Sequence, residues 1–342
     1  MTYSVVIPLY NKASHIRRAV DSVLAQSVHD FELIVVDDGS TDGGGDVVRQ
    51  VDDPRVRLIV QQNAGVSAAR NRGAQQGVSE LVAFLDADDA WEPDFLESVA
   101  SLRERFPHAA VWGTAYRIIS RSGVEEPPTY HGELPTDADG DLLDYFAGKH
   151  IAGKHGDSPL LASTVLVQRS ALFQAGGFPV GVVRGEDTDT WVRLALRYPI
   201  AWSPRPRVIV HEDAENRTDI FLYLGDYPLL ESARAFQAEQ GSQVLSGRVH
   251  EYLAWRHTGL LRTKWLTGER ALLREIVHEF RHTKGYSWKC SKWYLLSWIP
   301  HPVVKVAWKA RQRLAGRDTA FPQLREIRSS AISPIMTIGQ GQ

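Results

Sequence analysis

Leu81-Val82-Ala83-Phe84-Leu85-Asp86-Ala87-Asp88-Asp89 is the stretch of sequence that decides the fold, because an apolar run ends there in three carboxylates. The run predicts a buried strand, and Leu33-Ile34-Val35-Val36 leads in the same way into Asp37-Asp38. One such strand end would indicate only a turn or a helix cap. Two of them predict a ligand site, because ligands bind at the carboxyl ends of the strands in open α/β sheets. Clustered carboxylates repel one another unless a cation joins them, and hard oxygen ligands suit Mg²⁺ or Mn²⁺.

The composition of the 342-residue chain excludes several classes of protein. Lys and Arg number 39 and Asp and Glu number 41, so no global positive field indicates nucleic acid as a partner. Cys290 is the one cysteine, which excludes an intrachain disulfide framework and is typical of a reducing compartment. The first residues predict a strand rather than a signal peptide, and no apolar stretch has the length that spans a bilayer. We therefore expect a soluble or peripheral cytoplasmic protein.

Strand and helix patterns alternate along the first part of the chain. The expected strands are 4–9, 32–36, 56–60, 81–85, 109–112 and 163–168. The expected helices are one capped by Ser14 and others at 42–51, 66–77, 93–106 and 187–197. This βαβ series predicts an α/β fold with a mixed, mostly parallel sheet. Between the strands expected at 109–112 and 163–168, the Gly-, Pro- and Asp-rich stretch 122–159 predicts a long functional or mobile loop.

Five motifs follow one another in a fixed order. They are VIPLYN at 6–11, VVDDGSTD at 35–42, QNAGVSAARNRG at 62–73, DADD at 86–89, and GED at 185–187 with Trp191 and Arg193 after it. Each is weak alone, but the ordered set resembles the family 2 glycosyltransferases, nucleotide-sugar-dependent enzymes of the GT-A fold. The resemblance implies a Rossmann-like GT-A catalytic domain at 1–211, with a nucleotide-binding part at about 1–113 and an acceptor part at about 114–211. We expect a helical C-terminal region at 212–328 and a disordered tail at 329–342.

By this resemblance, the second motif supplies the nucleotide site. Asp38 is the candidate that accepts the imide N–H of a uracil, which a carboxylate at a strand end can do. Asp37 either lies beside it in the site or simply caps the turn into Gly39, and both interpretations stay open. The further nucleotide contacts that we expect are Pro8, Tyr10, Asn11 and Asp86.

The third motif supplies groups for the nucleotide and its diphosphate. Asn63, Gly65 and Arg70 would bring backbone amides and a guanidinium to the start of a helix, a geometry that favours phosphates. A salt bridge from Arg70 to Asp86 or Asp38 is the structural alternative, and the two roles can coexist.

Asp86 and Asp88 form the Asp-x-Asp pair of the resemblance. We expect Asp88 to be the main ligand of Mn²⁺ or Mg²⁺, with Asp89 second and Asp86 a further candidate ligand, while one carboxylate of the group faces the ribose. The ion would bridge two phosphates and neutralise charge on the departing nucleoside diphosphate. His211 is a further candidate ligand, although a lone histidine is more often structural. Asp89 has an alternative role as the cap of the helix that begins near Pro93.

Glu186 and Asp187 precede an amphipathic helical segment, where acids are stabilised by the helix dipole. Capping is therefore the structural explanation for the pair. The dipole lowers the pKa of a carboxyl group and an adjacent acid raises it, which leaves one carboxylate able to accept a proton. By resemblance, Asp187 is the general base for an acceptor hydroxyl, and Glu186 orients the acceptor or the loop. Single displacement then inverts the anomeric configuration.

The segment from Phe280 to Arg317 has nine Lys and Arg residues and no Asp or Glu. It contains four of the ten tryptophans, at 288, 293, 298 and 308. On its last helix, one face would carry Val303, Val304, Ala307 and Trp308, and the other Lys305, Lys309 and Arg313. Two interpretations remain, a helix that lies on an anionic membrane or a packed appendage with a solvated basic face. Pro300 and Pro302 predict a break into two short helices.

The leading hypothesis is an inverting glycosyltransferase. It would move a sugar from a nucleoside diphosphate, with UDP favoured, to a hydroxyl of a saccharide or lipid-linked saccharide. A sugar nucleotidyltransferase would need a Gly-rich loop after the first strand, where this chain has Leu9-Tyr10-Asn11-Lys12. A non-catalytic nucleotide-sugar-binding protein would lack the base or the metal carboxylates, and Asp88 and Asp187 are both present.

Overall fold

The computed structural model describes most of the chain in two compact units. The described residues are 3–128, 134, 142–149, 158–182, 185–214, 229–239, 247–259, 261, 264–265, 268–283 and 288–314. The first unit is Met1–Arg256 with Thr283–Gly285, and the second is His257–His282 with Tyr286–Gln342. The tail expected at 329–342 lies outside the described residues.

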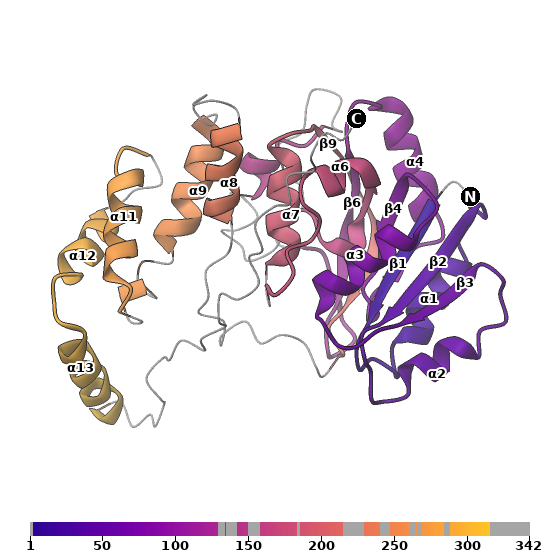
Figure 1. Cartoon of the computed structure of the whole chain (residues 1–342), viewed down its shortest axis with the longest axis horizontal. Coiled ribbons are helices and arrows are strands. Elements are labelled where there is room, and N and C mark those ends of the chain that lie inside the picture. Colours follow the sequence, from indigo (N-terminus) through magenta and orange to yellow (C-terminus); the bar gives the residue numbers. More distant parts are fainter. Residues whose placement is uncertain are drawn as a thin grey trace, which may run out of the picture. The chain divides into compact units, whose positions relative to one another are not determined.

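The first unit has an α/β fold built on one sheet with parallel and antiparallel strands, as the sequence predicts (Figure 1). Within the described residues its strand order is β3-β2-β1-β4-β8-β6-β9-β5, with β7 paired to β6. The parallel part consists of β1 (Tyr3–Leu9), β2 (Phe31–Asp37), β3 (Val56–Val60) and β4 (Leu81–Phe84).

The remaining strands extend the sheet beyond β4. They are β8 (Val165–Gln168), β6 (Val111–Ile119), β9 (Ile200–His211) and the short β5 (Ala90–Trp91) and β7 (Glu125–Glu126). β8 runs antiparallel to both β4 and β6, whereas β9 runs parallel to β6. The expected strand at 109–112 is thus the beginning of a longer one, and part of the expected strand at 163–168 forms a 3₁₀ turn.

The central strands are continuous apolar runs because helices cover both of their faces. All seven residues of β1 and of β2 are buried, and so are all four of β4. In the parallel register Leu9 lies beside Asp37, and Val6 lies beside both Ile34 and Phe84. The acidic residues that follow β2 and β4 therefore meet at one edge of the sheet.

The helices between the strands of this unit are α1 (Ile16–Leu24), α2 (Gly44–Arg49), α3 (Val66–Gln76), α4 (Phe95–Arg105), α6 (Arg169–Gln174) and α7 (Glu186–Ala195). All of them except α6 lie where the sequence predicts a helix. The cap expected at Ser14 and the alternative role of Asp89 as a cap are both wrong. His15 rather than Ser14 precedes α1, without a side-chain cap, and Asp94 rather than Asp89 precedes α4.

Helix α3 lies unusually close to the sheet. A Cβ atom on Gly73 would come within 2.3 Å of Val6 Cγ1, so only glycine permits this approach. Two residues before Gly73, the Asn71 side chain donates to the carbonyl oxygen of Phe178 and accepts from its N–H, both at 2.8 Å. These contacts fix α3 and the Arg70 side chain that it carries between the sheet and the segment before α7.

Helices dominate the described residues beyond β9. They are α8 (Leu229–Glu239), α9 (Gly247–Gly259), α11 (Arg270–Phe280), α12 (Trp288–Leu296) and α13 (His301–Leu314). The break predicted at Pro300 and Pro302 is confirmed, because α12 ends before it and α13 begins at His301. On α13, Val304 is buried while Val303 and Ala307 are exposed, although the helical spacing places all three on one side of the helix. In the part of the chain that is described, no helix has both the length and the apolar character needed to cross a membrane.

Candidate functional site

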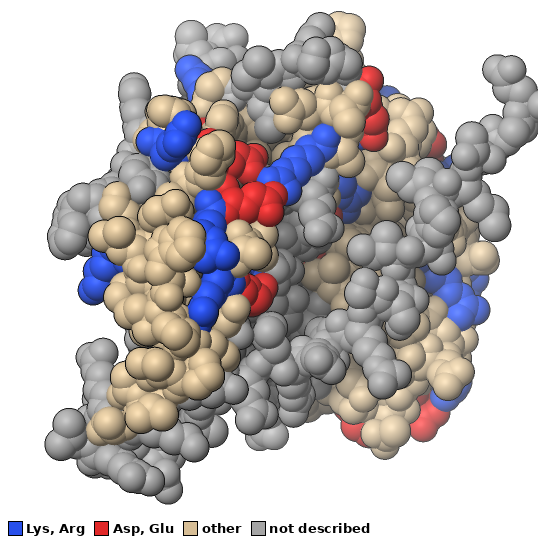
Figure 2. All heavy atoms as spheres, turned by 60° about the vertical axis from the view of Figure 1, so that its left-hand side comes forward, with Lys and Arg blue, Asp and Glu red and all other residues tan. Residues whose placement is uncertain are grey.

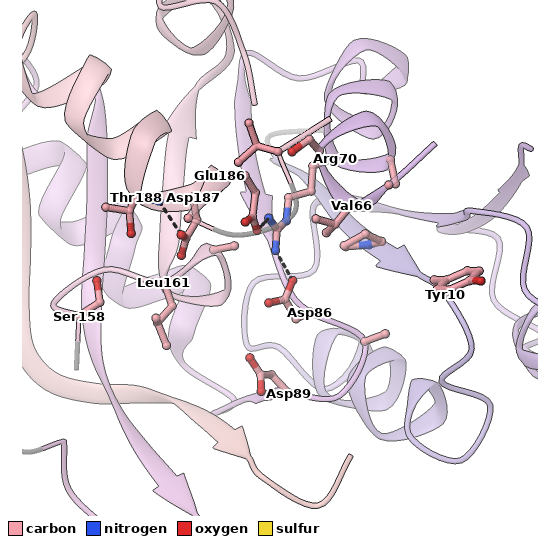
Figure 3. A pocket seen from close by; sticks show the side chains of 18 of the residues that line it. Tyr10, Val66, Arg70, Asp86, Asp89, Ser158, Leu161, Glu186, Asp187 and Thr188 are labelled. Atoms are coloured by element: carbon pink, nitrogen blue, oxygen red, sulfur yellow. Dashed lines mark hydrogen bonds and ion pairs between the residues drawn. The ribbon is translucent and has the colours of Figure 1, made fainter. Parts of the chain in front are cut away.

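A cavity of about 980 Å³ lies in the first unit, where the carboxyl ends of β1, β2 and β4 meet the beginnings of α3 and α7 (Figure 3). Most of the predicted site residues line it. They are Pro8, Tyr10, Asp38, Asn63, Gly65, Arg70, Asp86, Asp88, Asp89, Glu186 and Asp187. Asn11, Asp37 and His211 are not among the lining residues.

Asp38 holds the loop that precedes α3. Its Oδ1 accepts hydrogen bonds from the backbone N–H of Ala64 (2.9 Å) and the Gln61 side chain (2.6 Å), and its Oδ2 accepts from Gly65 N–H (2.8 Å). The Asn63 side chain donates to the Asp38 carbonyl oxygen at 3.0 Å. An ionised carboxylate has about four acceptor positions, so these contacts leave room for one ligand donor. The role of Asp38 in uracil recognition stays a prediction.

Asp37 and Asn11 secure the neighbouring turn. Asp37 Oδ1 accepts from Ser40 N–H at 2.9 Å, and Asn11 Oδ1 accepts from Thr41 N–H at 2.8 Å. Asn11 has a φ of 49°, in the left-handed region that asparagine tolerates. For Asp37 this geometry supports the turn-capping interpretation. The predicted contacts of both residues with a nucleotide stay predictions.

Arg70 is almost fully buried and joins two carboxylates from distant parts of the chain. Its guanidinium donates to Asp86 Oδ1 at 2.7 Å and to Glu186 Oε1 at 2.9 Å (Figure 3). Burial acts to lower the pKa of Arg70, but the charges of Asp86 and Glu186 outweigh it and raise that pKa. The salt bridge to Asp86 considered from the sequence is present, and Arg70 lines the cavity at the same time.

The acidic strand end after β4 is already partly neutralised by the protein. Asp88 Oδ2 accepts a hydrogen bond from Lys12 Nζ at 2.8 Å. Asp89 is buried and accepts from Ser163 Oγ at 2.6 Å and from the backbone N–H of His211 at 3.3 Å. Burial raises the pKa of Asp89 well above its usual value, and the neighbouring carboxylates of the segment add to this effect. Asp89 therefore joins this segment to the 3₁₀ turn before β8 and to the end of β9.

The fit of a divalent cation depends on Asp88. No three His, Cys, Asp or Glu side chains of the described residues form a group that could hold a metal ion. Mg²⁺, however, usually takes one or two protein carboxylates and completes its ligands from substrate phosphates and water. Asp88 lines the cavity and offers the hard oxygen that such an ion prefers. A cation would also relieve the repulsion between the neighbouring carboxylates, which contributes to the raised pKa of Asp89. The donor set therefore fits a cation shared with a substrate.

Glu186 and Asp187 are the first two residues of α7 and have different environments. Glu186 is paired with Arg70, and burial together with the adjacent charge of Asp187 raises the pKa of Glu186. Asp187 Oδ1 accepts from Thr188 N–H at 2.5 Å, and Asp187 forms no ion pair with any described residue. Its carboxylate lines the cavity with acceptor positions to spare (Figure 3).

Several lining residues were not predicted from the sequence. Besides Lys12, they include Lys149, Ser158, Thr188, Tyr252, Trp255 and Arg256. Lys149 and Ser158 lie in the stretch read as a long loop, where no periodic pattern indicated a role. The last three did offer a signal, because the spacing i, i+3, i+4 places them on one face of α9.

Comparison with known proteins agrees with this geometry. The family described as Glycosyl transferase family 2 matches residues 4–155. The putative teichuronic acid biosynthesis glycosyltransferase TuaG of Bacillus subtilis (strain 168) is 31% identical over 196 residues, which are 56% of this chain and 71% of TuaG. An uncharacterized glycosyltransferase of Rickettsia felis is 30% identical over 202 residues, 58% of this chain but 31% of that protein. An uncharacterized glycosyltransferase of Nostoc sp. is matched over 33% of its length. The chain therefore spans about a third of the Rickettsia felis and Nostoc proteins.

Solved structures share the fold. Residues 1–349 of S. aureus TarS superpose with a TM-score of 0.60 at 19% identity, covering 82% of this chain and 81% of that one. The same protein in complex with UDP-GlcNAc gives a TM-score of 0.57 at 21% identity, covering 78% of this chain and 73% of that one. At this identity the likeness shows a common GT-A architecture.

Proposed function

The chain belongs to glycosyl transferase family 2, and from that membership we propose that it transfers a sugar from a nucleoside diphosphate to an acceptor hydroxyl with inversion. The observation that carries the proposal is Asp187, a carboxylate without an ion-pair partner among the described residues, beside a pocket lined by the Asp38 loop and the acidic strand end. Acid–base chemistry and nucleotide recognition thereby share one cavity.

UDP is the nucleotide that we propose for the donor. Solved complexes of TarS, which has the same fold, contain UDP-GlcNAc and UDP. In this chain, Asp38 has one acceptor position left beside the hydrogen bonds that it accepts from Gln61, Ala64 and Gly65, and that position suits the imide N–H of uracil. A saccharide or a lipid-linked saccharide would supply the acceptor hydroxyl.

Asp187 would act as the general base. The acceptor hydroxyl passes its proton to Asp187 while its oxygen forms a bond to the anomeric carbon. The bond from that carbon to the diphosphate oxygen breaks on the opposite side, and its electron pair leaves with the nucleoside diphosphate. Glu186 is held by Arg70 and would orient the segment rather than take the proton.

Asp88 would hold Mg²⁺ or Mn²⁺ together with the diphosphate oxygens, with Asp89 supporting it from the buried side. A bound ion supplies positive charge to the departing diphosphate. Lys12 donates to Oδ2 of Asp88, so the other oxygen of this carboxylate would hold the ion. Lys12 would remain at the cavity as a donor to the phosphates.

The test measures UDP binding and the release of UDP from UDP-sugars by the full chain, with and without Mn²⁺. We expect UDP to bind, Mn²⁺ to strengthen that binding, and at least one UDP-sugar to be turned over. UDP binding without turnover of any sugar in the presence of acceptors would indicate a binding protein. Absence of UDP binding would overturn the donor proposal.

We propose that the C-terminal helices bind to the surface of an anionic membrane. Leu295, Trp298 and Val306 are 68%, 65% and 68% exposed, and the ring of Trp298 lies 4.8 Å from the guanidinium carbon of Arg274. Figure 2 brings this part of the chain forward and shows Lys and Arg side chains, with Asp and Glu side chains beside some of them, set in a broad uncharged surface. Exposed apolar side chains next to basic ones suit the interface of an anionic bilayer.

Sedimentation with lipid vesicles tests this surface. We expect the chain to sediment with vesicles that contain anionic lipid, to be released by salt, and to bind less when Lys305, Lys309, Arg311 and Arg313 are changed to Gln. Equal sedimentation with neutral and anionic vesicles, or none, would overturn the proposal.

A further inference from the structure

The cavity has a second end that the nucleotide motifs do not explain. It lies beyond Asp187 and is lined by Lys149, Ser158, Thr188, Tyr252, Trp255 and Arg256. Figure 3 shows Ser158 and Thr188 on the side of Asp187 opposite to Arg70 and Tyr10. A molecule bound there meets Asp187 from the side away from the nucleotide motifs, which is where an attacking hydroxyl must come from.

Lys149 is the residue at this end that most needs an explanation. Its side chain is buried, and its Nζ donates to Ser158 Oγ and to Thr188 Oγ1, the latter at 3.3 Å. Both partners are neutral hydroxyls, and no carboxylate of the described residues forms a salt bridge with Lys149. An ammonium group has three N–H donors, so one remains for a ligand in the cavity that Lys149 lines.

A buried ammonium without a counter-charge is costly to keep. Burial lowers the pKa of Lys149 to about 8, while the charge of Asp187 acts to raise it and that of Arg256 acts to lower it. Among the described residues, those are the charged groups that act on Lys149. A bound anion would supply the missing counter-charge.

The two ends of the cavity differ in their balance of charge. In the part next to the nucleotide motifs, Lys12 is paired with Asp88, and Arg70 with Asp86 and Glu186. In the part beyond Asp187, the charged lining residues among those that the structure describes are Lys149, Arg256 and Asp187 itself. Of these, Lys149 has no salt bridge to a described carboxylate.

Helix α9 adds an aromatic wall to this end. Tyr252, Trp255 and Arg256 face the cavity from successive turns, and the rings of Tyr252 and Trp255 are 6.1 Å apart. Aromatic side chains with a few charged groups are the usual lining of a site for an organic ligand. A flat ring also covers the apolar face of a sugar or a polyol chain.

We propose that this end binds the acceptor and that the acceptor carries an anionic group, a phosphate or a carboxylate, to which Lys149 donates a charge-assisted hydrogen bond. This inference rests on the proposed function, because it assigns the hydroxyl partner of the same site. Lys149 also screens the acceptor anion from Asp187, which would otherwise repel it.

The experiment compares three probes that share one ring and differ in charge, namely glucose, glucose 6-phosphate and glucuronic acid. Their binding to the full chain is measured by saturation-transfer NMR without nucleotide, and UDP affinity is measured in parallel. We expect at least one anionic probe to bind about tenfold more tightly than glucose, since a charge-assisted hydrogen bond has that magnitude. Preference for the phosphate alone or the carboxylate alone would support the inference and identify the group.

Lys149→Met removes the charge and keeps the length of the side chain, and we expect the preference to fall to within about twofold while UDP affinity stays the same. Lys149→Arg should retain part of the preference. Arg49→Met removes an exposed charge on α2, paired with Asp46, and is the control for general electrostatics. Equal binding of the three probes by the parent chain, or a preference that survives in Lys149→Met, would overturn the inference.

A measurement on the parent chain alone covers the case in which Lys149→Met does not fold. Because Lys149 loses its proton as the pH rises through about 8, the preference for the anionic probe should fall severalfold between pH 7 and pH 9. A preference that is constant over this range would count against Lys149. Failure of the parent to bind UDP would instead overturn the proposed donor, and the probe comparison does not depend on it.

Discussion

The two ends of the cavity show two ways of placing charge in a protein interior. At one end, buried Arg70 is held between Asp86 and Glu186, so each charge has a counter-charge within hydrogen-bonding distance. At the other end, buried Lys149 has two hydroxyl groups. The first arrangement is complete without a ligand and stabilises the fold. The second has no salt bridge to a carboxylate of the described residues, and this difference indicates where the chain keeps a binding function at the expense of stability.

Removing the charge of Arg70 should have the largest effect. Arg70→Met leaves Asp86 and the buried Glu186 without their cation, and loss of one partner of a buried pair typically destabilises a protein by about 3–5 kcal/mol. Urea unfolding followed by circular dichroism measures the change, and Arg49→Met on the surface is the control. A loss below about 1 kcal/mol would show that the two ends do not differ as described.

Asp187→Asn should lower sugar transfer by about a hundredfold or more, the usual magnitude for the loss of a general base. UDP affinity should stay unchanged, because Asp187 contacts neither the Asp38 loop nor the acidic strand end in the described structure. Initial rates and calorimetric UDP titrations test both statements, with Asp46→Asn as the surface control. A fully active variant would disprove the base assignment, and so would a variant that cannot bind UDP.

Lys149→Met should stabilise the chain, which is the opposite of the effect at Arg70. The pKa of Lys149 is about 8 in the folded chain against 10.5 for an unperturbed lysine, so the protonated form is disfavoured by folding. The gain should be on the order of 1–3 kcal/mol, after the two lost hydrogen bonds are allowed for. It should be complete below about pH 8 and fade as the pH rises towards 10.5. Thermal melts at pH 7 and pH 10 measure it, and destabilisation at pH 7 would contradict the argument.

Asp88→Asn should have a smaller effect that depends on metal. Changing a carboxylate that holds the ion should weaken UDP binding about tenfold in Mn²⁺ and leave it unchanged in EDTA. Titration of Mn²⁺ by electron paramagnetic resonance gives an independent measure of the ion. Equal Mn²⁺ affinity in the variant and the parent would exclude Asp88 as a ligand.

The same comparison explains what the sequence could predict. The nucleotide end is built from residues that directly follow strands, such as Asp38 after β2 and Asp86 after β4, so strand patterns alone bring them together. The parallel register of β2 and β4 with β1 then determines how far along the sheet Asp38 and Asp86 lie. The motif Gly185-Glu186-Asp187 was equally visible, because it begins an amphipathic helix.

The acceptor end could not be predicted in this way. Lys149 reaches the cavity from a stretch without periodicity, and Trp255 comes from a helix whose partners depend on tertiary packing. Local patterns carry no information about such contacts. Asp89 shows the same limit on a smaller scale. Its position suggested a helix cap, but its carboxylate instead accepts from Ser163 and His211, which follow it by 74 and 122 residues.

Because of Arg70, we expect the donor and the acceptor to change each other's affinity. One guanidinium holds Asp86, at the donor side, and Glu186, beside the base. A ligand that changes the position of Asp86 alters the hydrogen bond that Glu186 receives, and filling the acceptor side acts on Asp86 through the same atoms. Linkage requires the two effects on affinity to be equal. Donor affinity should therefore depend on acceptor concentration, by a factor that the reverse titration must reproduce.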